Sequence, residues 1–206
     1  MNSLLKSIDV KEAISFVKTV ALLLVLAVFL RGTVIEAFKI PSASMRPTLR
    51  EGDHILVSKL SFGLRAAGFP LTLVRWAEPS RGDIVVFTRH DDPRTFEDES
   101  DVNVIKRVIA IAGDKIEVRG TSVYLNDERQ VEPYARWEEG GIEEGYFGPV
   151  VVPPGRVLLL GDNRDHSKDS RFWHDPFLDI SRVKGRALVI YWCWEDFWQR
   201  MFKIVR

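Results

Sequence analysis

Two segments of this sequence combine residue types that can support acyl-transfer chemistry. The first is IPSASMRPTL, residues 40–49, in which Ser42 and Ser44 lie between Pro41 and Pro47. Because proline fixes the backbone angle φ, such a loop can present a serine rigidly and leave backbone N–H groups free to face a ligand. The same composition is also typical of a plain linker, so this segment alone leaves both interpretations open.

The second reactive group is a lysine within an apolar segment. The run VNVIKRVIAIAGD, residues 102–114, alternates like a strand, which puts Lys106 on one face with Val104 and Val108 and puts Arg107 on the other. Burial disfavours the charged ammonium, and a lysine can respond by losing its proton, whereas an arginine effectively cannot. A desolvated Lys106 would be a general base near neutral pH; the alternative is a strand-edge lysine whose ammonium reaches water.

A third segment, GDNRDHSKDSR at residues 161–171, is almost entirely polar. An EF-hand loop needs oxygen ligands at positions three and five and a glycine at six, but these positions hold Arg164, His166 and Ser167. The calcium-loop interpretation therefore fails, and the Asp and Arg side chains fit a network that braces a site. The sequence also contains no G-x-S-x-G and no H-E-x-x-H motif.

Charge and cysteine content narrow the class of protein. Lys and Arg number 29, as do Asp and Glu, so the formal net charge is zero. Neutralising phosphates requires a basic excess, and no nucleic-acid partner is expected. The balance conceals two basic sectors, residues 31–75 and 181–206, on either side of an acidic middle. Cys193 is the only cysteine, which excludes an intramolecular disulfide and a thiolate metal cluster.

The elements that must position these residues begin with an apolar segment. Residues 13–30, AISFVKTVALLLVLAVFL, carry one charge, Lys18. If that lysine extends toward headgroups, the segment approaches the roughly 20 residues that a bilayer core requires. A cleaved signal peptide would need a small-x-small site, which RGTVIE does not provide, and a buried core helix is the other alternative. We predict a transmembrane anchor over residues 13–35 behind a cytoplasmic segment, residues 1–12.

Residues 36–206 are predicted to form one mostly β, antiparallel domain. Val- and Ile-rich runs are bounded by Gly, Pro and Asp at the spacing typical of such a fold. Two acidic excursions, residues 89–101 and 132–148, are expected to be surface loops. The tail, residues 194–206, places aromatic and basic residues at helical spacing, which predicts a short amphipathic helix that packs on the sheet or lies at a membrane interface.

In this order, five segments resemble those of bacterial type I signal peptidase, also called leader peptidase. They are the apolar segment, IPSASMRPTLREGDHILVSK, RGDIVVF, VIKRVIAIAGD and GDNRDHSKDSR, and the likeness covers nearly the whole chain. The resemblance implies a serine endopeptidase with a Ser/Lys dyad and without metal or cofactor. It would be a single-pass protein of the bacterial plasma membrane with an extracytoplasmic catalytic domain. Its partners would be the lipid bilayer and the signal peptides of exported preproteins, cleaved at Ala-x-Ala-like sites.

The resemblance also implies roles for individual residues. Ser44 matches the nucleophile and Lys106 the general base. Ser42 matches the hydroxyl that helps the Ser44 amide form the oxyanion hole, and Ser167 matches the serine that orients the lysine. The other matches are the supporting ion pair Asp169 and Arg171, the structural block Asp162, Asn163 and Arg164, and the substrate-pocket residues Phe38, Ile40, Leu49, Val104 and Ile105. In one departure, His174 stands where the family usually has glycine.

Two other functions fit parts of the sequence. A repressor-type self-cleaving Ser/Lys protease would share the dyad chemistry, but it would need a DNA-binding helix pair where this chain has its apolar segment. A membrane-tethered β module that binds peptides without cutting them would keep its function after Ser44→Ala, whereas a peptidase would lose it.

Overall fold

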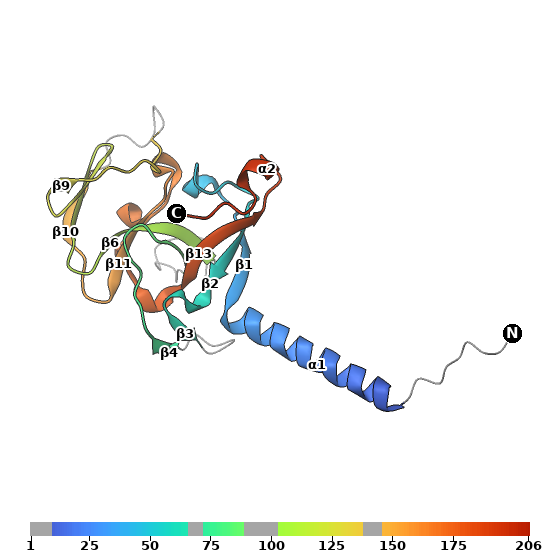
Figure 1. The fold of residues 1–206 in the computed structure, drawn as a ribbon. Helices are drawn as coiled ribbons and strands as arrows, with labels where there is room; N and C mark the ends of the chain where they lie inside the picture. Colours follow the sequence, from blue (N-terminus) through green and yellow to red (C-terminus); the bar gives the residue numbers. More distant parts are fainter. Residues whose placement is uncertain (1–9, 66–71, 89–102, 138–145) are drawn as a thin grey trace.

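The structure, a computed structural model, describes residues 10–65, 72–88, 103–137 and 146–206. These residues form mainly antiparallel β-structure, which confirms the mostly β, antiparallel part of the predicted fold (Figure 1). The strands are β1 (Ile35–Lys39), β2 (His54–Ser58), β3 (Gly63–Arg65), β4 (Thr72–Arg75), β5 (Ile84–Thr88), β6 (Asn103–Ile111), β7 (Lys115–Arg119), β8 (Ser122–Leu125), β9 (Glu128–Arg129), β10 (Phe147–Val151), β11 (Arg156–Leu160), β12 (Phe177–Asp179) and β13 (Val183–Trp192). The helices are α1 (Val10–Thr33) and α2 (Phe197–Arg200), and the 3-10 turns are η1 (Ala43–Met45), η2 (Lys59–Ser61), η3 (Arg164–His166), η4 (Ser170–Phe172) and η5 (Ile180–Arg182).

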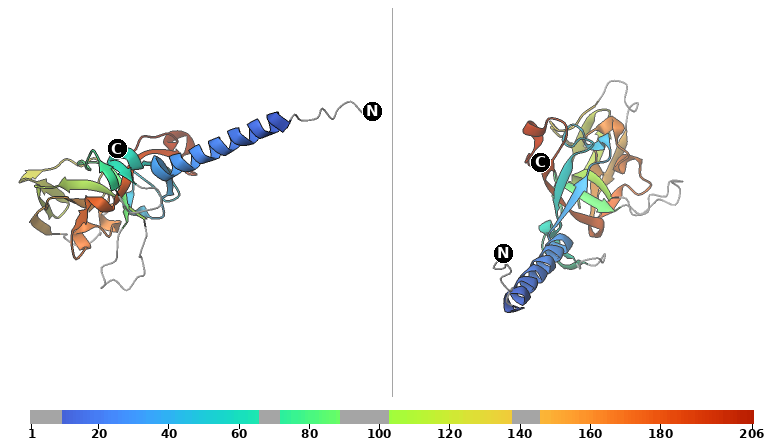
Figure 2. Two further views of the ribbon diagram at one scale, coloured as in Figure 1. Left: turned by 90° about the horizontal axis from the view of Figure 1, so that it is seen from below. Right: turned by 90° about the vertical axis from the view of Figure 1, so that its right-hand side faces the viewer.

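Helix α1 extends away from the β domain instead of packing along it (Figure 2). Its apolar side chains are exposed, among them Leu22 at 67% and Leu24 at 62%. The helix ends at Thr33, and after a turn at Val34 the extended strand β1 begins at the β-branched Ile35. Across the part of the chain whose side chains are described, no helix supplies a stretch both long and apolar enough to cross a membrane. The predicted transmembrane anchor over residues 13–35 is therefore not confirmed.

A seven-stranded antiparallel sheet forms the centre of the domain, in the order β1-β2-β13-β5-β6-β11-β12. Its strands show the expected alternation. In β2, Ile55 and Val57 expose none of their surface, while the alternate residues His54, Leu56 and Ser58 are half-buried. Strand β6 lies between β5 and β11, so both of its edges are paired. Lys106 and Arg107 are thereby fixed on a rigid inner strand.

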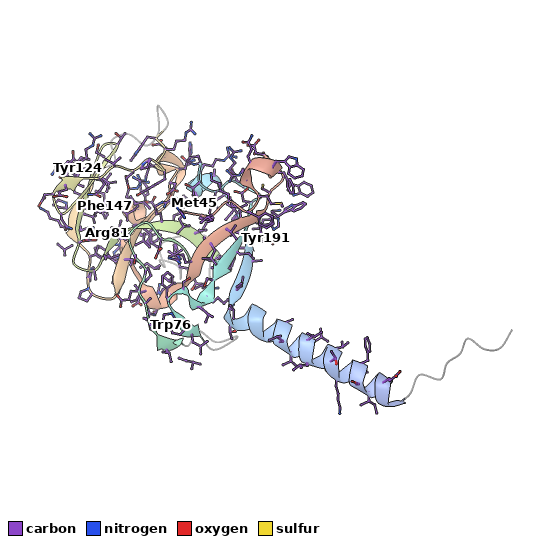
Figure 3. All side chains as sticks on the ribbon, in the orientation of Figure 1. Met45, Trp76, Arg81, Tyr124, Phe147 and Tyr191 are labelled. Atoms are coloured by element: carbon purple, nitrogen blue, oxygen red, sulfur yellow. The ribbon has the colours of Figure 1, made fainter. Side chains whose placement is uncertain are left out.

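Two smaller sheets complete the described fold. One has the order β10-β7-β8-β9, and the other is the hairpin of β3 and β4. The hairpin lies close to the domain end of α1, whereas β9 and β10 lie on the far side of the domain (Figure 1). Met45 sits inside the domain, while Trp76, just after β4, lies at its outer edge near the junction with α1 (Figure 3).

The carboxy-terminal tail departs from the prediction. Only Phe197–Arg200 is helical, so the helix expected over residues 194–206 is wrong for residues 194–196 and 201–206. The following residues pair with β13: Phe202 N donates to Ile190 O at 2.7 Å, and Ile190 N donates to Lys203 O at 3.0 Å. Strand β5 pairs with β13 only up to residue 186, so the rest of that edge of β13 is available to the tail. Unpaired backbone groups at a sheet edge favour such pairing over continued helix.

The structure describes part of one of the two predicted acidic excursions and none of the other. Residues 89–101 lie outside the described part of the chain. In the second excursion, residues 132–137 are not a solvated loop, because Tyr134 and Trp137 pack against a core cluster. The backbone of Arg136 is also held, donating to Asp162 O at 2.7 Å and accepting from Arg164 N at 2.9 Å. The acidic composition of this segment indicated an exposed loop, whereas its two aromatic residues cover apolar surface of the core.

Candidate active site

Ser44 lies in the tight turn η1, and buried apolar residues hold both ends of its loop. Ile40 precedes the turn, Leu49 follows it and Met45 lies within it; their side chains are 2%, 0% and 0% exposed. Hydrophobic burial therefore fixes the loop on both sides of the serine. Ser44 itself is 7% exposed. The expected rigid presentation of this serine thus rests on core anchors as well as on proline.

Lys106 reaches Ser44 from the inner strand β6. The Lys106 side chain is 4% exposed, and its Nζ donates to Ser44 Oγ at 2.6 Å. Burial lowers the pKa of Lys106 to about 8, and the Asp169 and Asp162 carboxylates only partly oppose that effect. The amine therefore loses its proton at a lower pH than an ordinary lysine does. Of the two interpretations of Lys106, the desolvated one fits the structure.

Ser42 lies beside Ser44 on the same loop. The two hydroxyl oxygens are 3.4 Å apart, and Ser42 is exposed. A hydroxyl in this position can donate to an oxygen that approaches the turn from solvent. The geometry brings together the three groups that the resemblance implied for proton transfer and for oxyanion binding, namely Lys106, Ser44 and Ser42.

Arg107, the neighbour of Lys106, is also buried, with 2% of its surface exposed. Its Nε and Nη2 donate to the two carboxylate oxygens of Asp162 at 2.8 and 2.7 Å, and its guanidinium stacks 3.8 Å from the centre of the Tyr134 ring. The paired carboxylate offsets the cost of burying this charge. The alternation of β6 left open whether its cations are buried or reach water; both are buried, and each has a partner.

The structural block of Asp162, Asn163 and Arg164 connects Arg107 to residues 40–49, the serine loop. Thr48 Oγ1 donates to Asp162 at 2.5 Å, so one carboxylate holds the loop and the strand together. Asn163 adds two bonds, from its backbone N–H to Ser44 O at 3.1 Å and from Nδ2 to Ala43 O at 3.2 Å. Through these contacts, Asp162 and Asn163 hold the turn that carries Ser44 in position.

The third member of the block, Arg164, has a partner that the sequence analysis did not single out. Its guanidinium makes a two-pronged contact with the Glu132 carboxylate at 2.7 and 2.8 Å, and its Nε donates to Gly161 O at 3.0 Å. Glu132 was assigned to a surface excursion, and no local motif marks it as buried. Its distance of 32 residues from Arg164 explains why only the fold reveals the pair.

Asp169 and Arg171 form the expected ion pair. Arg171 Nε donates to Asp169 Oδ1 at 2.8 Å, and the other carboxylate oxygen accepts from Gly161 N at 2.9 Å. Arg171 Nη2 also donates to Arg164 O at 2.6 Å. The pair therefore fixes the backbone at the start of the polar segment. His174, which follows this segment, is exposed.

Ser167 does not make the bond that the resemblance implied. Its hydroxyl is buried and has no hydrogen-bond partner among the described residues, so it does not orient Lys106 in this structure. It lies against Gly161: a Cβ added at Gly161 would collide with the Ser167 side chain and come within 2.5 Å of Ser44 O. Ser167 therefore packs beneath the serine loop, and Gly161 permits that close approach.

The substrate-pocket residues are not all together. Phe38, Ile40, Leu49 and Ile105 belong to one cluster, whereas Val104 packs on another. Leu49 exposes none of its surface and Ile40 exposes 2%, so these two residues serve as core anchors here. Phe38 and Val104 are the half-buried members of the set and retain surface that a ligand can contact.

The chemistry of the arrangement follows from these contacts. A hydroxyl beside a buried amine of lowered pKa can lose its proton to that amine as it attacks a carbonyl. Within the described ranges, His, Cys, Asp and Glu side chains form no group that could hold a metal ion. The site is thus equipped for acyl transfer by a serine.

Comparisons with known proteins identify relatives of this chain. The family described as "Signal peptidase, peptidase S26" matches residues 13–192. Signal peptidase I of Pseudomonas aeruginosa is 29% identical over 211 residues, covering 84% of this chain and 70% of the relative. Probable signal peptidase I-2 of Synechocystis is 36% identical, covering 85% and 71%, and signal peptidase I of Bacillus licheniformis is 32% identical, covering 90% and 92%. A crystal structure of a signal peptidase I from Enterococcus faecalis V583 is 28% identical with a TM-score of 0.41, covering 53% of this chain and 96% of that one.

Proposed function

Because the chain belongs to the signal peptidase family, peptidase S26, and is a serine endopeptidase, we propose that it cleaves signal peptides from exported preproteins with Ser44 and Lys106 as its catalytic dyad. The observation that carries the proposal is the 2.6 Å contact between Lys106 Nζ and Ser44 Oγ, both almost completely buried. Family membership favours this function over a non-catalytic peptide-binding module and over a self-cleaving repressor.

In the proposed reaction, neutral Lys106 accepts the Ser44 proton as the hydroxyl oxygen attacks the scissile carbonyl carbon. The Ser44 N–H and the Ser42 hydroxyl donate to the oxyanion that forms. The Lys106 ammonium then gives its proton to the leaving amine, and the peptide bond breaks to leave an acyl ester on Ser44. Water, deprotonated in turn by Lys106, hydrolyses the ester and restores the hydroxyl.

The surrounding charges support this assignment. Asp162 and Asp169 are each neutralised by an arginine, Arg107 and Arg171, so neither carboxylate forms an ion pair with the lysine. A salt bridge to Lys106 would hold its proton, whereas burial favours its loss. The polar network can thus order the loop and still leave the base with a lowered pKa.

Substrate choice is proposed to follow from the apolar residues near the turn. Phe38, at the edge strand β1, and Ile105 share the cluster that anchors the serine loop. An extended peptide can add to such an edge by main-chain hydrogen bonds, and only small side chains would fit against this crowded surface. That arrangement agrees with cleavage after small-x-small sequences such as Ala-x-Ala.

The proposal includes a membrane location with the catalytic domain on the extracytoplasmic face. Helix α1 leaves Leu22, Leu24 and Val25 more than 60% exposed, and a lipid environment would cover them. Carbonate extraction of cell membranes tests this point: the wild-type chain should stay in the pellet, and the double variant Leu24→Asp, Val25→Asp should move to the supernatant, because charges at the centre of a span are costly. Recovery of the wild type in the supernatant would contradict the location.

The decisive experiment is cleavage of a preprotein by the full chain in uncharged detergent. Ser44→Ala should lower kcat/KM by at least about a thousandfold, and Lys106→Met should do the same, because both members of the dyad are needed for attack. Ser122→Ala, on β8, is the matched control and should cleave at the wild-type rate. Cleavage by Ser44→Ala at the control rate would refute the dyad.

A further inference from the structure

A small basic pocket lies beside the junction of α1 with the β domain. Its lining consists of Lys59, Phe62, Gly63, Arg75, Ile180, Val183 and Lys184. The hairpin of β3 and β4 supplies one wall, and η5 with the start of β13 supplies another. Of the described residues that line it, three are cations and none is acidic. The pocket is separate from the dyad, since neither Ser44 nor Lys106 contributes to its lining.

Arg75 has an unused donor in this pocket. Its Nη1 is buried and has no hydrogen-bond partner among the described residues. Buried polar groups are rarely left without a partner, and a guanidinium nitrogen without an acceptor is costly. The unpaired, buried N–H group of Arg75 therefore indicates that an acceptor binds in this pocket. Because the group belongs to a cation, an anion is the favoured acceptor.

The two lysines of the pocket differ in whether a carboxylate neutralises their charge. Lys59 Nζ lies 2.8 Å from the Glu36 carboxylate and donates to Gly32 O, near the end of α1, at 3.2 Å. Lys184 Nζ donates to the neutral Asn103 Oδ1 at 2.7 Å. In the described part of the chain, Arg75 and Lys184 have no carboxylate partner, so the pocket keeps a positive excess that attracts an anion.

The size of the pocket limits how an anion can bind. Its interior holds only about 10 Å³, enough for one oxygen-sized atom. A ligand must therefore insert a single oxygen toward Arg75 and keep its remaining atoms at the mouth, beside the lysines. A phosphate group suits this arrangement, because it can give one oxygen to the guanidinium and present others to nearby ammonium groups.

We propose that this pocket binds a phosphate group, with Arg75 as the principal donor and with Lys59 and Lys184 as flanking charges. The phosphate can belong to free inorganic phosphate or to the headgroup of an anionic lipid. The lipid source rests on the proposed attachment of α1 to a membrane. It is favoured by the side chains of Leu73, Val74 and Trp76, neighbours of Arg75 in sequence, which are 55%, 56% and 56% exposed and would meet a lipid surface. Figure 3 shows Trp76 at the outer edge of the domain.

The first arm of the test titrates the full chain in uncharged detergent with inorganic phosphate at constant ionic strength, by calorimetry. Arg75→Met keeps the apolar stem and removes the charge, and it should weaken binding at least about tenfold. Lys184→Gln should weaken it severalfold. Arg129→Met, an exposed cation on β9 at the far side of the domain, is the matched control and should bind like the wild type.

The second arm counts lipid adducts on the same proteins by native mass spectrometry in micelles doped with phosphatidylglycerol or with zwitterionic phosphatidylcholine. Adducts that favour phosphatidylglycerol and decrease in Arg75→Met identify the lipid headgroup as the source. Arg75-dependent binding of inorganic phosphate without lipid preference identifies free phosphate. Both results support the site.

Binding that is unaffected by Arg75→Met in both arms would overturn the proposal. Should Arg75→Met fail to fold, as judged by its unfolding transition, Lys184→Gln decides the question by the same criteria. Preprotein cleavage in detergent separates this site from the dyad. Arg75→Met should cleave at the wild-type rate, and a wild type that binds phosphate but does not cleave would count against the proposed function alone.

Discussion

Lys106 Nζ lies 2.6 Å from Ser44 Oγ, although 62 residues separate the two side chains in sequence. The lysine is carried by the inner strand β6, and the serine by a turn whose flanking residues Ile40 and Leu49 are in the core. Both groups are therefore held by elements that are anchored in the core of the domain. Such preorganisation is what efficient proton transfer from a serine requires.

The rate of cleavage should depend on pH through Lys106. Its amine is active only when neutral, and burial lowers its pKa to about 8. We expect kcat/KM to rise with pH through an apparent pKa near 8 and to level off above it. A profile measured on a preprotein between pH 6 and 10 checks this prediction, and a rate already constant below pH 7 would contradict it.

The same lysine should make stability depend on pH. Between about pH 8 and 10.5 the unfolded chain binds the Lys106 proton while the folded chain does not, so the free energy of unfolding should rise with pH across this window. Lys106→Met removes the cost of burying the charge and should stabilise the protein at pH 7 by on the order of 2 kcal/mol. Urea unfolding at several pH values measures both effects. An equal pH dependence in Lys106→Met would rule out this lysine as its origin.

Asp162→Asn should affect both stability and the pH profile. The substitution leaves the buried Arg107 without its counter-charge, which typically costs about 3–5 kcal/mol. It also removes a negative charge that raises the pKa of Lys106, so the rise of kcat/KM should shift to lower pH. Asp127→Asn, which removes the exposed partner of Lys115, is the control and should change neither quantity appreciably. An unshifted profile in a folded Asp162→Asn protein would show that this carboxylate does not act on Lys106.

Arg200→Met should loosen the serine loop from the tail. Arg200 forms a buried ion pair with Asp53, which also accepts from Arg50 N at 2.8 Å next to that loop. Loss of the pair should reduce the free energy of unfolding by about 3–5 kcal/mol. It should lower kcat more than it changes KM, because the loop positions the nucleophile. Lys203→Met, an exposed charge of the same tail, is the comparison, and equal behaviour of the two variants would exclude this bracing role.

Gly161→Ala should damage both folding and cleavage. The added methyl group would meet the Ser167 side chain and lie within 2.5 Å of Ser44 O, so the serine turn must shift. We expect a loss of about 1–3 kcal/mol in stability and a lower kcat. Gly155→Asn is the control, because nothing lies within 4 Å of the added Cβ and asparagine is among the side chains that best tolerate a φ of +72°. Wild-type kcat in a folded Gly161→Ala protein would show that the turn tolerates displacement.

Sequence alone was sufficient for the features that depend on local pattern. Alternation in β6 placed Lys106 and Arg107 on opposite faces of one strand, and the prolines around Ser44 allowed a rigid loop, with a plain linker as the alternative. The Val- and Ile-rich runs predicted an antiparallel β domain, which the sheets confirm. Each of these inferences requires only the period of a strand or the stereochemistry of one residue type.

Tertiary structure alone decided which distant groups meet. Glu132 pairs with Arg164, and the tail pairs with β13 in place of continuing its helix. Ser167 packs under Gly161 and makes no bond to the lysine, whereas burial sets the pKa of Lys106. The physical reason is common to all: burial, ion pairing and edge pairing depend on neighbours that folding brings from far along the chain, and local composition cannot specify them.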